Sequence, residues 1–174
     1  MNKHVLAAQM YAQQVAGGQI PACKWTIEAV RRQIDDLQRV PSEDWPWVFD
    51  EAKAARPCEF IELLPHIKGK WARERQLILL EAWQCFIVTT IFGWVHKDTG
   101  LRRYREVFIE VPRKNAKSTL TSGIALYMLS ADGEHGAEVY SAATTRDQAR
   151  IVFDDVRPWP SARQTCGPTW AWPS

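Results

Sequence analysis

Two short runs that read as strands, each followed by a helical pattern, constrain the possible folds of this chain most. In REVFIEV, residues 105–111, Val107, Ile109 and Val111 alternate among β-forming residues, and the run ends at a proline. The second run, GAEVYSAAT at residues 136–144, follows the turn ADGEHG. Both runs are therefore predicted to be strands.

Each run leads into a segment with helical periodicity. After the first, the apolar stripe consists of Leu120, Ile124, Tyr127 and Met128. After the second, Thr144 stands three residues before Asp147 in a capping arrangement. The apolar face expected there consists of Ala149, Val152, Phe153 and Val156. An order of strand, helix, strand, helix implies a parallel sheet, so we predict an α/β fold.

The N-terminal region is predicted to be α-helical. Residues 3–16 have a helical pattern that ends at Gly17-Gly18, because glycine adopts the left-handed conformation without a steric clash. Residues 25–40 predict a second helix whose apolar face consists of Ile27, Val30, Ile34 and Leu37. Its solvated face is expected to carry Arg31 with Asp35 and Arg32 with Asp36. Prolines then predict short helices up to about residue 69, and a further helix is expected from Glu81 to the turn HKDTG.

The composition permits a folded core. With 174 residues, of which 46% are hydrophobic, the chain is long enough for one domain or part of a larger one. No apolar run approaches the roughly 18–20 residues of a membrane span, and the N-terminus lacks a secretory pattern. We therefore expect a soluble intracellular protein. Three parts are predicted: a helical region at 1–75, a partial α/β domain at 76–156 and a Pro/Trp-rich tail at 157–174.

The net charge and the cysteine content exclude few classes of protein. The net charge is +2, although basic residues crowd between 102 and 117, at Arg102, Arg103, Arg105, Arg113, Lys114 and Lys117. The spacing of the cysteines does not match that of metal ligands, so we expect reduced thiols. The four cysteines are Cys23, Cys58, Cys85 and Cys166. The histidines have no partner constellation in sequence.

The loop VPRKNAKST, residues 111–119, joins the first predicted strand to its helix. A phosphate cradle needs such a loop, a lysine for the β and γ phosphates, a hydroxyl for Mg²⁺ and a helix N-terminus. Lys117 and Ser118 supply the lysine and the hydroxyl. Val111 and Ala116 stand where the pattern GxxxxGK[ST] has glycine, so a basic loop with a solvated Lys117 is the alternative. If position 116 needs a positive φ, alanine costs roughly 1–2 kcal/mol over glycine.

Residues 77–156, from LILLEAWQ to FDDV, resemble the ATPase domain of tailed-bacteriophage terminase large subunits. The resemblance extends upstream through Ala-Cys-Lys at 22–24, RRQIDDL and HIKGKWA, and covers about residues 1–156. It implies a partial P-loop NTPase parallel sheet preceded by an α-helical N-terminal region. The chain is thus similar to the N-terminal part of a phage or prophage terminase large subunit, the motor that packages DNA into capsids.

The resemblance also implies roles for individual residues. ATP and Mg²⁺ are the expected ligands, with Ser118 as the Mg²⁺ ligand. Arg113 and Lys117 would be catalytic, because a guanidinium near the γ-phosphate offsets charge that develops during transfer. The nucleotide-binding residues would be Trp83, Gln84, Arg113, Lys114, Asn115, Ala116, Lys117, Ser118 and Thr119. Gln84 would read the adenine edge, and Ala116 departs from the family's usual glycine. Candidates for coupling nucleotide state to DNA are Thr144, Thr145 and Gln148.

The implied partners are double-stranded DNA, a portal protein and a small terminase subunit, in the cytoplasm of the host and without a membrane. An ATPase of this kind also needs an acidic strand. The stretch IVFDD at 151–155 has helical spacing and is rejected as that strand, and no acidic residue follows Asp155. We therefore expect a truncated chain, with a frameshift near residue 157 as the hypothesis.

Two other readings stay open at this point. One is a non-catalytic interaction fragment that docks on a terminase partner subunit without nucleotide. The other is a helicase-like ATPase that shares the loop, which leaves the N-terminal match unexplained.

Overall fold

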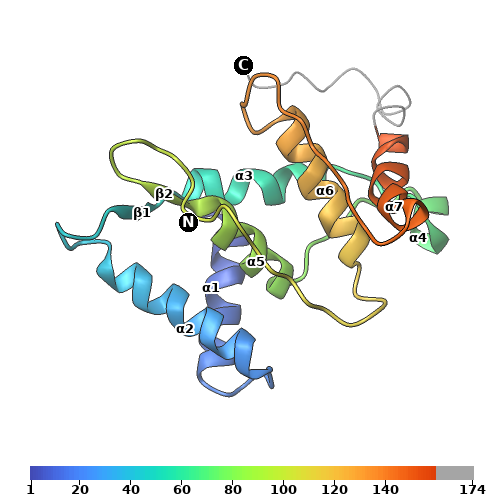
Figure 1. The fold of residues 1–174 in the computed structure, drawn as a ribbon. Helices are drawn as coiled ribbons and strands as arrows, with labels where there is room; N and C mark the ends of the chain where they lie inside the picture. Colours follow the sequence, from blue (N-terminus) through green and yellow to red (C-terminus); the bar gives the residue numbers. More distant parts are fainter. Residues whose placement is uncertain (160–174) are drawn as a thin grey trace. The chain divides into compact units, whose positions relative to one another are not determined.

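The computed structural model describes residues 1–159, which divide into two compact units (Figure 1). The first consists of Met1–Phe60 and Leu79–Glu110, and the second of Ile61–Ile78 and the described residues from Val111 onward. The domain boundaries proposed from the sequence stay a prediction. Residues 160–174, most of the expected tail, lie outside the described residues. None of the helices within residues 1–159 has the length and apolar character that a membrane span requires.

The first unit is built around α1 (Lys3–Ala16) and α5 (Ala82–Gly93), with α2 (Lys24–Arg39) against α1. The helices predicted at 3–16, at 25–40 and from Glu81 are confirmed. Asn2 caps α1 by accepting the backbone N–H of His4 at 3.0 Å, and the left-handed residue after the helix is Gly18. The apolar residues buried on α1 are Val5, Ala8, Ala12 and Val15, and the small ones let neighbouring helices approach closely.

Two short strands complete this unit. β1 (Trp47–Phe49) pairs antiparallel with β2 (Trp94–His96), and α3 (Glu51–Glu62) follows β1. Gly93 joins α5 to β2 where a Cβ atom would lie 2.5 Å from the Phe49 ring. Glycine at this position therefore lets the strand pass the aromatic side chain. The turn predicted at HKDTG follows β2, with Gly100 at φ 68°.

The expected solvated face of α2 is wrong at Asp36. This residue is 2% exposed, and Arg103 Nη1 donates to its Oδ2 at 2.6 Å. On the same helix, buried Gln33 accepts from Trp94 Nε1 at 2.7 Å. Both partners lie more than sixty residues away in sequence. Helical spacing alone therefore cannot distinguish this face from a solvated one.

Arg103 is also surrounded by aromatic rings. Its guanidinium carbon lies 5.0–5.8 Å from the ring centroids of Trp45, Trp47, Trp94 and Tyr104. Partly buried cation–π contacts of this kind each contribute on the order of 1 kcal/mol. Together with the Asp36 pair, they fix the segment after β2 against α2.

The second unit contains α4 (Gly69–Arg73), α6 (Lys117–Ser130) and α7 (Arg146–Val156). Leu120 and Tyr127 of the predicted stripe are buried in α6. Ser122 Oγ donates to the Val152 carbonyl of α7 at 3.3 Å. A Cβ atom on Gly123 would lie 2.9 Å from Ile61 Cγ1. Small residues thus allow α6 to pack closely in this unit.

The expectations for α7 are correct for the helix and wrong in detail. Its N-cap is Thr145, which accepts from the Gln148 N–H at 3.3 Å, in place of Thr144. Phe153 of the expected apolar face is exposed, and the buried residue of this helix is Asp155. Lys68 Nζ lies 2.5 Å from Asp155 Oδ1 and compensates the buried charge.

Neither predicted strand forms in the described residues. Runs 105–111 and 136–144 are not assigned as strands, and the sheet observed in residues 1–159 is the antiparallel β1–β2 pair. Phe108 and Tyr140 are 89% and 84% exposed. A strand needs a neighbour for its backbone groups, so β-forming composition without a partner is insufficient. The mixed α/β class agrees with the structure, whereas no parallel sheet is observed among the residues that the structure describes.

Candidate nucleotide-binding loop

Residues 111–116 lead directly into the N-terminus of the 14-residue helix α6. Ala116 is the N-cap residue at φ 51°, ψ 21°, and its carbonyl accepts the Leu120 N–H at 2.9 Å. Lys114 has φ 70°. Position 116 therefore has the positive φ that glycine would adopt at lower cost, although the residue there is alanine.

The backbone of this loop has the conformational features of an anion nest. Lys114 and Ala116 have positive φ, and Asn115 between them does not. Alternation of handedness turns successive N–H groups toward one side of a chain. Asn115 Nδ2 donates to the carbonyls of Pro112 and Arg113, at 3.2 and 3.4 Å. Two carbonyl groups of the loop thus accept hydrogen bonds from a side chain of the same loop.

The electrostatics of the loop favour an anion. Arg113, Lys114 and Lys117 are exposed, and residues 111–119 contain no acidic residue. Ser118 and Thr119 are half-buried in the first turn of α6. The N-cap has no side-chain hydrogen bond, so no capping side chain competes for the first N–H groups of the helix. These groups and the helix dipole together favour negative charge.

Trp83 and Gln84 belong to the first unit, in the first turn of α5. Gln84 is buried, and its Oε1 accepts the backbone N–H of Glu81 at 2.9 Å. The Glu81 side chain in turn caps the backbone at Gln84, so the two form a capping box. The spacing E-x-x-Q at a helix start could have predicted this role. The adenine contact of Trp83 and Gln84 stays a prediction.

The coupling candidates surround the start of α7. Thr145 caps the helix, and Thr144 Oγ1 lies 2.8 Å from Gln148 Oε1. These contacts give all three residues a local structural role. Residues 151–155 lie within α7, which confirms that IVFDD is not a strand. Within residues 1–159, no three His, Cys, Asp or Glu side chains are grouped to hold a metal ion.

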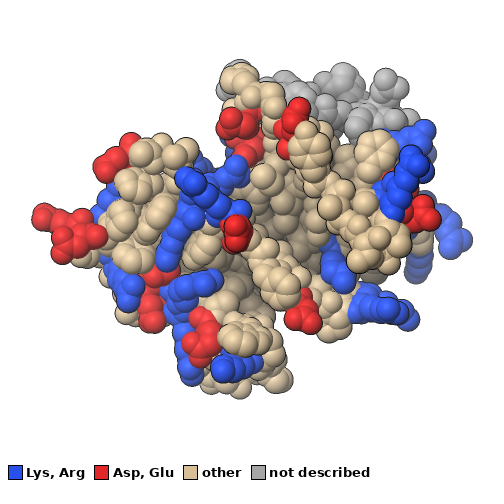
Figure 2. All heavy atoms as spheres, in the orientation of Figure 1, with Lys and Arg blue, Asp and Glu red and all other residues tan. Residues whose placement is uncertain are grey.

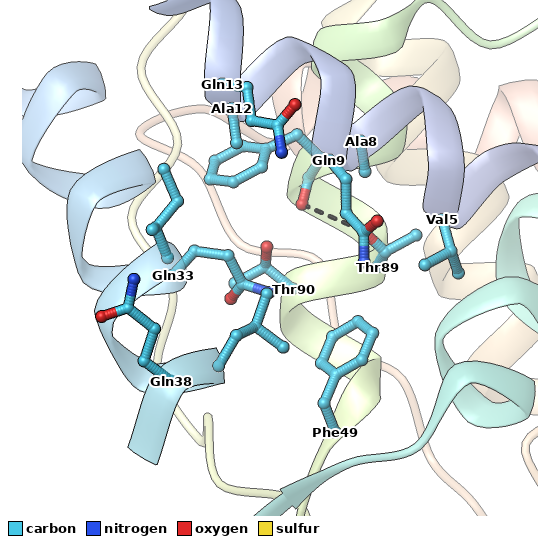
Figure 3. A pocket seen from close by; sticks show the side chains of 13 residues that line it. Val5, Ala8, Gln9, Ala12, Gln13, Gln33, Gln38, Phe49, Thr89 and Thr90 are labelled. Carbon is cyan, nitrogen blue, oxygen red and sulfur yellow. Dashed lines mark hydrogen bonds between the residues drawn. The ribbon is translucent and has the colours of Figure 1, made fainter. Parts of the chain in front are cut away.

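A cavity of about 330 Å³ lies in the first unit, and none of the predicted site residues is among those that line it (Figure 3). It is lined by Val5, Ala8, Gln9, Ala12, Gln13, Gln33, Ile34, Leu37, Gln38, Phe49, Phe86, Thr89 and Thr90. The hydroxyl of Thr90 is buried and has no hydrogen-bond partner within the described residues. Apolar and carboxamide groups share this lining, which carries no charged side chain.

Residues 82–162 match a family model of an ATPase domain. The family is the terminase large subunit, so the resemblance predicted from the sequence is confirmed over a segment just under half the length of the chain. The segment includes Trp83, Gln84, the loop at 111–119, α6 and α7. No curated protein and no solved structure matches the chain.

Proposed function

We propose that residues 111–119 bind the phosphates of MgATP, and that the chain supplies the ATP-binding part of a motor that packages double-stranded DNA. The observation that carries the proposal is the left-handed backbone at Lys114 and Ala116, immediately before the N-terminus of α6. The match to the terminase ATPase domain supports it, because the same residues lie inside the matched segment.

The chemistry asked of the loop is positioning and charge compensation. Lys117 would meet the β and γ phosphates, and Arg113 would offset the charge that develops on the transferred group. Ser118 would supply one hydroxyl ligand to Mg²⁺, which, when bound, neutralises part of the phosphate charge. Backbone N–H groups at the start of α6 would hold the remaining phosphate oxygens. Trp83 and Gln84 would contact the adenine.

The partners follow from the family. Double-stranded DNA is the proposed substrate of the motor, with a portal protein and a small terminase subunit as assembly partners in the host cytoplasm. Residues 111–119 would then contribute ATP binding to the packaging cycle.

Binding of a fluorescent ATP analogue with Mg²⁺ tests the proposal. Lys117→Ala should weaken binding by at least about tenfold, which corresponds to about 1.4 kcal/mol. Lys24→Ala removes an exposed lysine of α2 and should leave binding unchanged. Equal binding by the parent and Lys117→Ala would overturn the assignment of the loop. Absence of binding by a chain with a cooperative unfolding transition would favour the interaction fragment, for which exposed Phe108 and Tyr140 offer contact surface.

A further inference from the structure

Residues 65–77, called here the α4 loop, form a closed element of the second unit. Its base is a bridge between Pro65 and Leu77, next to which the His66 N–H donates to the Gln76 carbonyl at 2.8 Å. The N–H of the same Gln76 donates to the Trp71 carbonyl at 2.9 Å and so joins the base to α4. These bonds fix the position of α4 without help from side chains.

Two side-chain contacts hold the same loop near α7. Lys68 pairs with buried Asp155, and Trp159 Nε1 donates to the Pro65 carbonyl at 2.9 Å. The loop is therefore tied at its base and along one side. A side chain that stays exposed on such a fixed element presents a constant surface to a partner, with little conformational entropy left to lose.

Trp71 is that exposed side chain. It is 56% exposed, and the His66 ring lies 4.9 Å from it, centroid to centroid, at 43°. Burial lowers the pKa of His66, so this imidazole is neutral at neutral pH and supports the indole without adding charge. The contact orients the tryptophan ring and leaves more than half of the residue open to a ligand.

The residues that flank Trp71 in the sequence of the α4 loop are mainly basic. The α4 loop carries four basic residues, Lys68, Lys70, Arg73 and Arg75, against the acidic Glu74. Glu74 is already engaged by Lys70 at 3.6 Å and by Gln76 at 2.8 Å. Lys and Arg side chains gather over the part of the molecule labelled α4 and α7 (compare Figures 1 and 2). Arg75 has φ 54°, a strained conformation for a residue with a Cβ atom.

We propose that the α4 loop binds single-stranded nucleic acid, with a base stacked on Trp71 and phosphates on Lys70, Arg73 and Arg75. An exposed aromatic ring among cations is the combination that such ligands require, because every base has a flat face and every nucleotide carries a charge. Bases of a duplex interior are already stacked on their neighbours, so the exposed indole favours single strands. The proposal goes beyond the function proposed above, and it involves no residue of the ATP loop.

Fluorescence anisotropy of a labelled oligothymidylate and of a duplex of equal length tests this, with the full chain and no added nucleotide. We expect the single strand to bind more tightly. Trp71→Ala should weaken its binding about 5- to 100-fold, and Trp71→Phe should restore much of it. The matched control is Trp25→Ala, because Trp25 is 74% exposed and has Lys24 Nζ 5.1 Å from its ring centroid, outside the α4 loop.

Salt dependence separates phosphate contacts from stacking. Replacing Lys70, Arg73 and Arg75 by glutamine should reduce the slope of log K against log salt by about 2, since each contact with a single strand contributes about 0.7. Equal binding by Trp71→Ala and Trp25→Ala would overturn the proposal, as would tighter binding of the duplex. Binding of the parent to anionic vesicles but not to the oligonucleotide would overturn it in favour of a membrane surface. None of these results depends on ATP binding.

Discussion

Replacement of Ala116 by glycine should stabilise the chain. The N-cap alanine is held at φ 51°, ψ 21°, where the Cβ atom of an L-residue costs about 1–2 kcal/mol. Glycine removes this cost, but it also makes the unfolded chain more flexible, which offsets about 0.4–1 kcal/mol. The expected net gain in the free energy of unfolding is therefore about 0.5–1 kcal/mol. For a chain of this size, the midpoint of thermal unfolding should rise by about 1–4 °C.

The matched control is Ala131→Gly, at the other end of the same helix. Ala131 has φ −135°, a conformation that alanine adopts without strain, so glycine relieves nothing there. This variant should lose about 0.4–1 kcal/mol through the unfolded state. Chemical denaturation of the parent and both variants, without nucleotide, gives the comparison. Equal destabilisation by the two substitutions would refute the argument that the cradle carries backbone strain at position 116.

Three further substitutions test the packing of the first unit. Thr90→Val removes a buried hydroxyl that has no hydrogen-bond partner within the described residues, so the free energy of unfolding measured by denaturation should rise by about 1 kcal/mol. Thr90→Ser keeps the hydroxyl and should lower the free energy of unfolding. A lower free energy of unfolding in Thr90→Val would contradict the reasoning. Asp36→Asn removes the charge opposite Arg103 and should cost about 3 kcal/mol, against about 0.5 kcal/mol or less for exposed Asp35→Asn. Gly93→Ala places a Cβ atom 2.5 Å from Phe49 and should cost about 1–3 kcal/mol; if the double variant with Phe49→Leu recovers no stability, the clash is not the cause.

Local chemistry made much of the helical structure predictable. The helix at 3–16 ends where glycines occur, and the helix predicted from Glu81 begins at the next residue, with Glu81 as its cap. Such signals act over one turn, so they can be read from neighbouring residues. Long-range pairs leave no such trace. Asp36 and Arg103 are 67 residues apart, and Lys68 and Asp155 are 87 apart. In sequence, each acidic residue resembles any charge on an exposed helix.

The two β-forming runs illustrate a different limit. Phe108 and Tyr140 are residue types that favour strands, yet both are exposed, and their segments have no strand pairing within residues 1–159. A helix satisfies its backbone groups internally, whereas a strand depends on a neighbour that the local sequence does not specify. Periodicity therefore predicted α6 and α7 correctly and the strands beside them incorrectly.

The candidate loop shows why a pattern of glycines is an indirect test for a phosphate cradle. What the chemistry requires is a backbone that turns its N–H groups inward before a helix N-terminus, and glycine is only the residue that adopts this conformation at least cost. Here Lys114 and Ala116 adopt positive φ without being glycine. The departure from GxxxxGK[ST] thus raises the energy of the loop, while the left-handed conformation at positions 114 and 116 is present. A cradle with alanine at this position should bind nucleotide with the same geometry as one with glycine, and the difference between them should appear in the stability of the folded chain.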